Sequence, residues 1–183
     1  MAEALDLRLE AAPEVRGWRP SPMVEGLERP LGLSGAGLVV RRIRLQAGAV
    51  TVVAAPAAIW RCDPTRHKLL SLKKAAAAAG ERVILVPDTA VRRQPQLATA
   101  AMVAANRGEA PSIEGRRRIA AEIEARGGVA PMGDLADLVG ETFHPVRALL
   151  ALLGERFIAV DLGQPISSDT PVALWARRHL LES

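Results

Sequence analysis

Hydrophobic positions change their spacing along the chain, and each change predicts a different kind of element. The first 36 residues are rich in Pro and Gly, so we expect an irregular lead-in with only short helical pieces such as 23–28. Two β-branched runs, 38–45 and 50–55, then predict a hairpin closed by a four-residue turn at 46–49. Because the second run is apolar throughout, it is expected to be a buried central strand.

The next pattern is a helix followed by a strand. Asp63 fits an N-cap, Pro64 fits the first helical position, and Gly80 marks the end of the helix. A short apolar strand at 82–86 follows, and a right-handed crossover would place it parallel to the second hairpin strand. A further helix at 95–106 is expected to pack back on this sheet, which makes the first part of the chain α/β.

After residue 111 the pattern becomes mainly helical, and we place a domain boundary there. Ser112 begins a helix on which Ile113, Ile119 and Ile123 fall near one face.

The remaining predicted elements are a short helix at 132–138, a helix at 144–153, a strand at 157–161, a loop at 163–169 and a strand at 171–174. Three helices followed by a two-stranded ribbon is the order of a winged helix-turn-helix domain. We therefore expect an α/β domain over 1–111 and a small winged-helix domain over 112–183.

Composition adds a basic charge to this picture. The net charge is +4, and basic side chains comprise 21 Arg but only three Lys. The positive excess lies in residues 64–111, with eight basic and three acidic residues, against eight and seven in 1–63 and eight and ten in 112–183. Such a balance permits contact with a polyanion. Only five residues are Phe or Trp and none is Tyr, which is few for a protein that stacks single-stranded bases.

Several classes of protein are excluded by what the sequence lacks. No run reaches the roughly 18 to 20 apolar residues of a membrane helix, and the acidic N-terminus does not fit a signal peptide. The single cysteine, Cys62, excludes an internal disulfide framework, so we expect a reducing cytoplasm. His67, His144 and His179 lack metal-ligand spacing, and the Gly-rich run 32–37 precedes a strand instead of opening a helix. We therefore expect no metal and no cofactor.

The stretch from Val50 to Gln96 has a more informative pattern. A strand leads through Trp60-Arg61-Cys62-Asp63 into a Lys-bearing helix, then into the strand at 82–86 and the segment Val91-Arg92-Arg93-Gln94-Pro95-Gln96-Leu97. This order resembles the TnsA-like endonucleases of the restriction-endonuclease-like, PD-(D/E)XK, superfamily. The winged helix that follows extends the likeness over about residues 38–178. The resemblance implies a restriction-endonuclease-like sheet-and-helix domain that contacts DNA.

The active-site motif of that family is degenerate in this chain. Cleavage in the family uses a Glu of the first helix, an Asp of the first hairpin strand and a Glu/Gln-x-Lys triplet of the second. Glu25 or Glu28 could supply the first, but the Asp position falls in Val39-Val40-Arg41-Arg42-Ile43 and the triplet position reads Val53-Ala54-Ala55. Because Mg²⁺ needs oxygen ligands, the resemblance implies a nuclease fold without a catalytic residue.

Candidate DNA contacts are basic side chains of both domains. In the strand at 38–45, Arg42 and Arg44 share one face and Arg41 points to the other. These arginines would border a DNA cleft, or alternatively protect an edge strand with charge. The other candidates in the first domain could form a second phosphate-facing surface, for which a solvated helix face is the alternative: Arg66, Lys68, Lys73, Arg92 and Arg93.

The second domain offers fewer candidates. In a DNA-reading winged helix the third helix enters the major groove and the wing reaches the adjacent groove. The candidates on the third helix are Thr142, His144 and Arg147, and those in the wing loop are Gln164, Ser167, Ser168 and Asp169. Arg116, Arg117 and Arg118 lie in the first helix, where they would flank the DNA backbone and not enter the groove. This set is small and the domain is net negative, so DNA reading and protein docking both stay open.

The sequence therefore predicts a non-catalytic DNA-binding protein that contacts phosphates through an Arg-rich surface. One alternative is an active metal-dependent endonuclease that uses migrated residues such as Glu25, Glu28 and Asp63. The other is a protein–protein adaptor or transcriptional regulator. A protein partner or a homodimer is compatible with each, and no membrane contact is expected.

Overall fold

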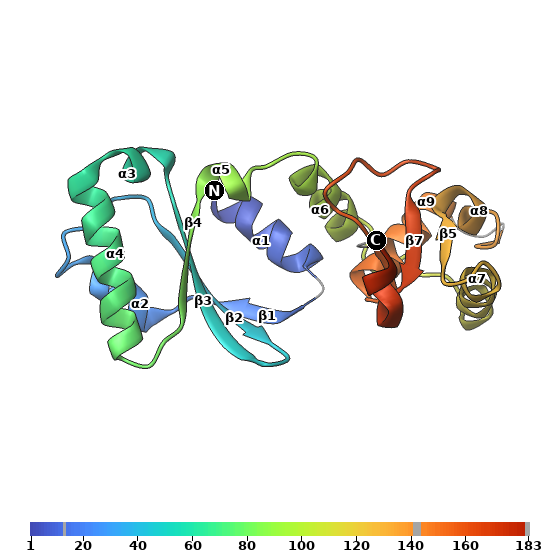
Figure 1. Cartoon of the computed structure of the whole chain (residues 1–183), viewed down its shortest axis with the longest axis horizontal. Helices are drawn as coiled ribbons and strands as arrows, with labels where there is room; N and C mark the ends of the chain where they lie inside the picture. The colour runs from blue at the N-terminus through green and yellow to red at the C-terminus, as the bar shows by residue number, and fades with distance from the viewer. Residues whose placement is uncertain (13, 141–143, 182–183) are drawn as a thin grey trace. The chain divides into compact units, whose positions relative to one another are not determined.

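A computed structural model describes residues 1–12, 14–140 and 144–181 (Figure 1). Its contacts divide the chain into two compact units, residues 1–93 (unit 1) and 94–183 (unit 2), whereas the sequence places the boundary after residue 111. Helices and strands occur together, which confirms the predicted mixed α/β class. None of the helices within the described ranges is long and apolar enough to cross a membrane.

Unit 1 is built on a mixed four-stranded sheet in the order β1-β2-β3-β4. Its strands are β1 (Val15–Arg19), β2 (Val39–Leu45), β3 (Gly48–Ala55) and β4 (Val83–Pro87). β2 and β3 form the predicted antiparallel hairpin, but Leu45 pairs with Gly48, so two residues and not four make the turn. β3 also pairs in parallel with β4, which confirms that it is the central strand.

Helices cover both faces of this sheet (Figure 1). They are α1 (Ala2–Ala11), α2 (Pro22–Glu28), α3 (Ala57–Arg61), α4 (Asp63–Ala78) and α5 (Asp88–Val91). Val24 of α2 and Leu72 of α4 join Val40 and Val53 of the sheet in one buried cluster. On the other face, α1 contacts β1 and α5 contacts β3 and β4.

Two predictions for unit 1 are wrong. The first 36 residues are not an irregular lead-in, because α1 buries Leu5 and Leu9 and β1 pairs with β2. The sequence signal of β1 is weak because its register shifts at a bulge between Val15 and Gly17. The N-cap of α4 is Cys62 and not Asp63, which lies one residue inside the helix.

Unit 2 combines helices with a three-stranded antiparallel sheet in the order β5-β7-β6. Its elements are α6 (Gln96–Ala105), α7 (Ile113–Ala125), β5 (Val129–Pro131), α8 (Met132–Ala136), α9 (Pro145–Gly154), β6 (Ile158–Val160), β7 (Pro171–Leu174) and a 3₁₀ segment, η1 (Trp175–Leu181). Ile119 and Ile123 of α7 pack in its core with Leu149 and Leu152 of α9.

Unit 2 departs from the sequence prediction in three places. The ribbon has a third strand, β5, whose three residues are too short for an alternating pattern to be visible. Ile113 is 73% exposed, because as the first residue of α7 it lies outside the buried stripe. The helix near residue 100, α6, groups with unit 2 and contacts α9.

Candidate nucleic-acid interface

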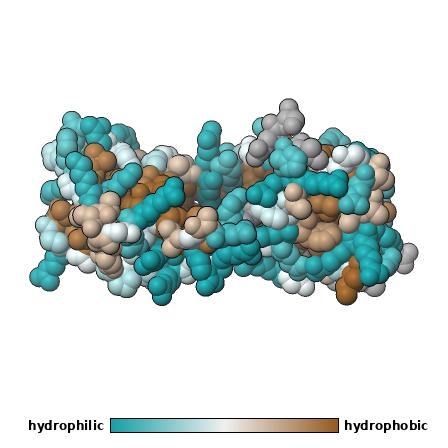
Figure 2. All heavy atoms as spheres, turned by 60° about the horizontal axis from the view of Figure 1, so that its bottom comes forward, coloured by the Kyte–Doolittle hydropathy of each residue, from teal (hydrophilic) through white to brown (hydrophobic). Residues whose placement is uncertain are grey.

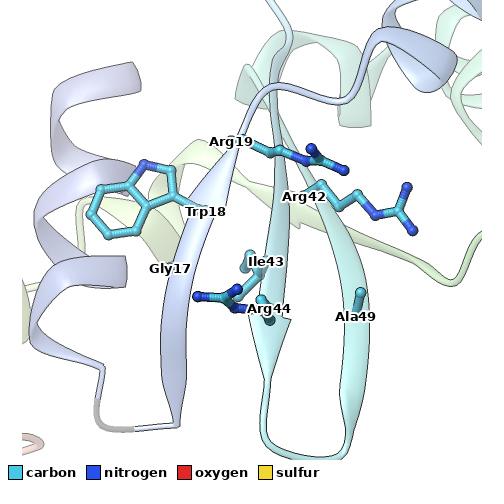
Figure 3. Close-up of a pocket in the computed structure, with 7 residues that line it drawn as sticks. All are labelled: Gly17, Trp18, Arg19, Arg42, Ile43, Arg44 and Ala49. Carbon is cyan, nitrogen blue, oxygen red and sulfur yellow. The ribbon is translucent and has the colours of Figure 1, made fainter.

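The predicted arginine strand β2 presents its side chains to two different environments. Arg42 pairs across the sheet with Arg19 of β1, and Arg44 pairs with Gly17. Since directly opposite residues share a face, Arg19, Arg42 and Arg44 project from the same side. Figure 3 shows the side chains of Arg19 and Arg42 next to each other, while Trp18 turns its ring toward a helix.

Helix coverage of this face ends partway along β2 and β3. Val40 and Val53 lie beneath α2 and α4, and the next pair along the strands is Arg42 and Thr51. Beyond it lies an open concavity of about 470 Å³, which we call the basic concavity. Its lining residues are Gly17, Trp18, Arg19, Arg42, Ile43, Arg44 and Ala49 (Figure 3).

A buried carboxylate borders the concavity on the helix-covered side. Ser21 donates a hydrogen bond to Glu81 Oε1 at 3.2 Å, and the hydroxyl of Thr51 donates to the same oxygen. Arg42 Nε lies 3.8 Å from that oxygen. Glu81 therefore accepts hydrogen bonds from two hydroxyl groups, and its ion pair with Arg42 is long and weak.

The guanidinium groups of the concavity have few acidic partners. Arg42 is 44% exposed and has only the long contact to Glu81 among the described residues. For Arg19 and Arg44, no ion pair is found within the part of the chain that the structure describes. The terminal nitrogens of these side chains can therefore donate to an external anion.

Arg41 is held on the opposite face and does not join them. Its Nε lies 2.8 Å from Asp6 Oδ1, and its Nη2 lies 3.0 Å from Oδ2, so α1 supplies a two-pronged carboxylate partner. These hydrogen bonds raise the pKa of Arg41, against a smaller lowering by burial. This ion pair stabilises the packing of α1 against the sheet.

The alternative function for these charges, protection of a sheet edge, is wrong for β2. This strand lies between β1 and β3 and pairs with both. Its backbone is not available to another strand, so Arg42 and Arg44 are not needed to prevent edge pairing.

The two basic candidates on α4 have different neighbours. Arg66 Nη2 lies 2.8 Å from Asp63 Oδ1 one turn earlier. Lys68 Nζ lies 3.5 Å from the carbonyl oxygen of Gly32. Both side chains reach solvent, but each already has a contact within the chain.

Arg92 and Arg93 follow α5 and are exposed. The α5 backbone is tied to α1, since Arg8 Nη1 donates to the carbonyl oxygen of Ala90 at 2.5 Å. Burial, and then repulsion from Arg93, lower the pKa of Arg8. Arg93 therefore lies in a second positive region, beside α1.

Most basic candidates of unit 2 are engaged by acidic residues. Arg116 Nη2 lies 2.7 Å from Glu155, and its guanidinium lies 6.0 Å from the centre of the Phe157 ring. Arg147 Nη1 lies 3.6 Å from Glu109. Arg117 is 77% exposed with a long 3.9 Å contact to Glu114.

At the start of α9, His144 is the exposed N-cap, while Thr142 lies outside the described residues. The predicted wing loop between β6 and β7 folds against α8. Gly133 N–H donates to the Ser168 carbonyl at 2.7 Å, and Met132 N–H donates to that of Thr170 at 2.9 Å. Gln164, Ser167, Ser168 and Asp169 of this loop are exposed.

The carboxylates of the endonuclease alternative lie on two helices. Glu25 and Glu28 are one turn apart on α2, and Asp63 begins α4 beside Arg66. Burial, and then repulsion from Glu25, raise the pKa of Glu28. Across the described residues, no group of three or more His, Cys, Asp and Glu is placed to hold a metal ion.

The structure adds Arg19 to the predicted set. Its sequence neighbourhood, between Pro13 and Pro22, gives no strand pattern, so the only available signal was its positive charge. Figure 2 shows hydrophilic side chains interspersed with hydrophobic patches over both units on one face of the molecule. Charge is nevertheless uneven, since unit 1 holds fifteen basic and nine acidic residues and unit 2 holds nine and eleven.

No protein-family model matches the chain, and no curated protein matches it.

Proposed function

We propose that unit 1 binds double-stranded DNA without cleaving it, through phosphate contacts from the basic concavity. The observation that carries this proposal is the helix-free part of the sheet where Arg19, Arg42 and Arg44 project together. Guanidinium groups bind phosphate oxygens with two parallel hydrogen bonds. Gly17 and Ala49 flank Arg44 on the two neighbouring strands and carry little or no side chain, so a phosphate can approach its guanidinium.

A duplex suits this surface better than a single strand. Non-specific single-strand binding relies on aromatic side chains on which bases stack. Trp18, the one aromatic residue lining the concavity, turns its ring away toward a helix (Figure 3). The concavity therefore offers positive charge that binds the phosphates of a duplex, and it offers no aromatic ring on which the bases of a single strand could stack.

The resemblance to TnsA-like endonucleases supports a nucleic-acid partner and argues against cleavage. The β2–β3 hairpin, the Lys-bearing α4 and the parallel β4 follow in the order on which that resemblance rests. At the triplet position, Val53, Ala54 and Ala55 are fully buried. We place no Mg²⁺ site there.

We further propose that unit 2 is a winged helix that docks a protein. Helices α7, α8 and α9 with the sheet β5-β7-β6 support the domain type. Engagement of Arg116 by Glu155 and of Arg147 by Glu109 favours docking over DNA reading, because these guanidiniums are partly neutralised.

Salt dependence of duplex binding tests the DNA proposal. Three phosphate contacts predict that log K falls with log salt with a slope of about −3, and little dependence on base sequence. Fluorescence anisotropy with two unrelated labelled duplexes measures both. Absence of binding at low salt would refute the proposal, and plasmid cleavage with Mg²⁺ or Mn²⁺ that is lost in Glu28→Gln would establish the endonuclease alternative.

A further inference from the structure

The outer edge of β4 is an unusual feature of unit 1. β4 ends the sheet, with β3 on one side and no strand on the other among the described residues. Its sequence, Val-Ile-Leu-Val-Pro, has no charged residue, and Ile84 is 42% exposed. An uncharged apolar edge is a template for pairing with another strand.

The opposite edge of the same sheet is protected. β1 carries Arg16 and Arg19 and has a bulge between Val15 and Gly17. Charge and bulges are the usual means by which edge strands avoid pairing. On β4, Pro87 at the end of the strand is the only residue of this protective kind.

Hydrogen-bonding groups of β4 face outward at alternate residues. Thr51 N–H donates to the Arg82 carbonyl at 2.8 Å, so the backbone of residue 82 faces β3. Alternation along a strand then directs the N–H and C=O of Val83 and Leu85 away from the sheet. These groups are available to a second strand.

The residues along this edge complement a second copy of themselves. In an antiparallel pair with its two-fold axis at Leu85, Ile84 lies opposite Val86. One step outside the strand, Arg82 of one copy approaches Asp88 of the other, which is the first residue of α5, so opposite charges come near each other at both ends. Arg82 is exposed, and Asp88 is partly exposed with a buried Oδ1 that has no hydrogen-bond partner among the described residues.

We propose that two copies of this chain pair antiparallel through β4 and form a continuous eight-stranded sheet. The interface is isologous, so each favourable contact occurs twice. Leu85 would exchange two hydrogen bonds with its counterpart, and Val83 N–H would donate to the carbonyl of Pro87. Because Pro87 has no N–H, pairing ends there.

Sedimentation velocity without DNA tests this proposal, so its failure leaves the DNA proposal untouched. The wild type is expected to sediment as a dimer at about 100 µM, where a micromolar dimer is populated. Ile84→Lys places an unpaired positive charge in the interface, and Arg82→Glu places a carboxylate near Asp88. Because the two-fold axis repeats each change, each variant is expected to weaken dimerisation about tenfold or more. Arg16→Glu makes the same charge reversal on the β1 edge and is expected to leave the dimer intact.

Hydrogen exchange identifies the surface directly. Protection of the Leu85 amide is expected to increase with protein concentration, and to do so less in Ile84→Lys. Circular dichroism confirms that each variant is folded. A wild type that stays monomeric at the highest concentration, or a dimer that both β4 variants leave unchanged, would overturn the proposal, as would pairing only with a strand of another protein.

Discussion

Three arginines close together on one strand have different roles because side chains alternate across a sheet. Arg41 faces α1 and is held by Asp6, whereas Arg42 and Arg44 face the basic concavity. Residue type alone does not distinguish them. Their position relative to the pleat decides which one can contact a ligand.

The contact between Asp6 and Arg41 predicts a stability effect without a binding effect. Asp6→Asn removes the charge that compensates a guanidinium only 19% exposed. We expect the free energy of unfolding to fall by about 1 to 2 kcal/mol, allowing for partial solvent screening. Urea denaturation measures the change, with Glu3→Gln on the exposed side of α1 as control. An equal loss in the control, or none in Asp6→Asn, would contradict this role.

Glu28 predicts a pH-dependent effect. Its raised pKa means that the folded state holds the carboxyl proton more tightly than the unfolded state. The resulting stabilisation is complete below the ordinary pKa of 4.5 and is lost as the pH rises through the folded-state value. At pH 7 the ionised carboxylate therefore opposes folding slightly.

Glu28→Gln should remove that cost. We expect the variant to be more stable than the wild type at pH 7, by about 0.5 kcal/mol or less because the site is partly exposed, with the advantage absent below pH 4.5. Denaturation at both pH values compares the variant with Glu14→Gln, a change at an exposed position. A difference that is independent of pH would show that Glu28 does not titrate as described.

At the scale of elements, the sequence predicted the helices and strands that a local pattern of apolar and turn residues marks. The β2–β3 hairpin, α4 with its Gly80 stop and the parallel β4 were visible because apolar runs and turn residues adjoin in sequence. β1 was not, because its sequence, Val-Arg-Gly-Trp-Arg, contains no apolar run and lies between Pro13 and Pro20. The partner of Arg41, Asp6, and the neighbour of Arg42, Arg19, were missed because both lie in this N-terminal segment.

Helix α7 offers a test at this scale. Ser112, where the sequence predicts that this helix begins, is its N-cap, and its Oγ accepts a hydrogen bond from Gly115 N–H at 3.2 Å. Ser112→Ala is expected to lower the free energy of unfolding of unit 2 by about 1 kcal/mol. Thermal unfolding measures this loss. Ser71→Ala, at an exposed position inside α4, should be neutral or slightly stabilising, and an equal loss in both variants would argue against the cap.

At the scale of the molecule, charge separates the two units. Unit 1 has a net charge of +6 and unit 2 of −2, so all of the positive excess lies in the unit with the basic concavity. This division agrees with DNA contact by unit 1 and protein contact by unit 2. Because the net charge of unit 1 attracts DNA wherever the charges lie, an experiment must distinguish this general attraction from phosphate contact in the basic concavity.

Two double variants that remove equal charge distinguish general attraction from contact in the basic concavity. Arg42→Ala with Arg44→Ala and Lys73→Ala with Lys74→Ala remove the same charge from unit 1, the second pair from exposed positions on α4. Binding of each to a labelled duplex across a salt series is the most direct measurement. We predict that the arginine variant loses about tenfold or more in affinity at low salt and about two units of salt slope, while the lysine variant binds nearly as the wild type does. Equal losses in the two variants, or wild-type binding by the arginine variant, would contradict a DNA site in the basic concavity.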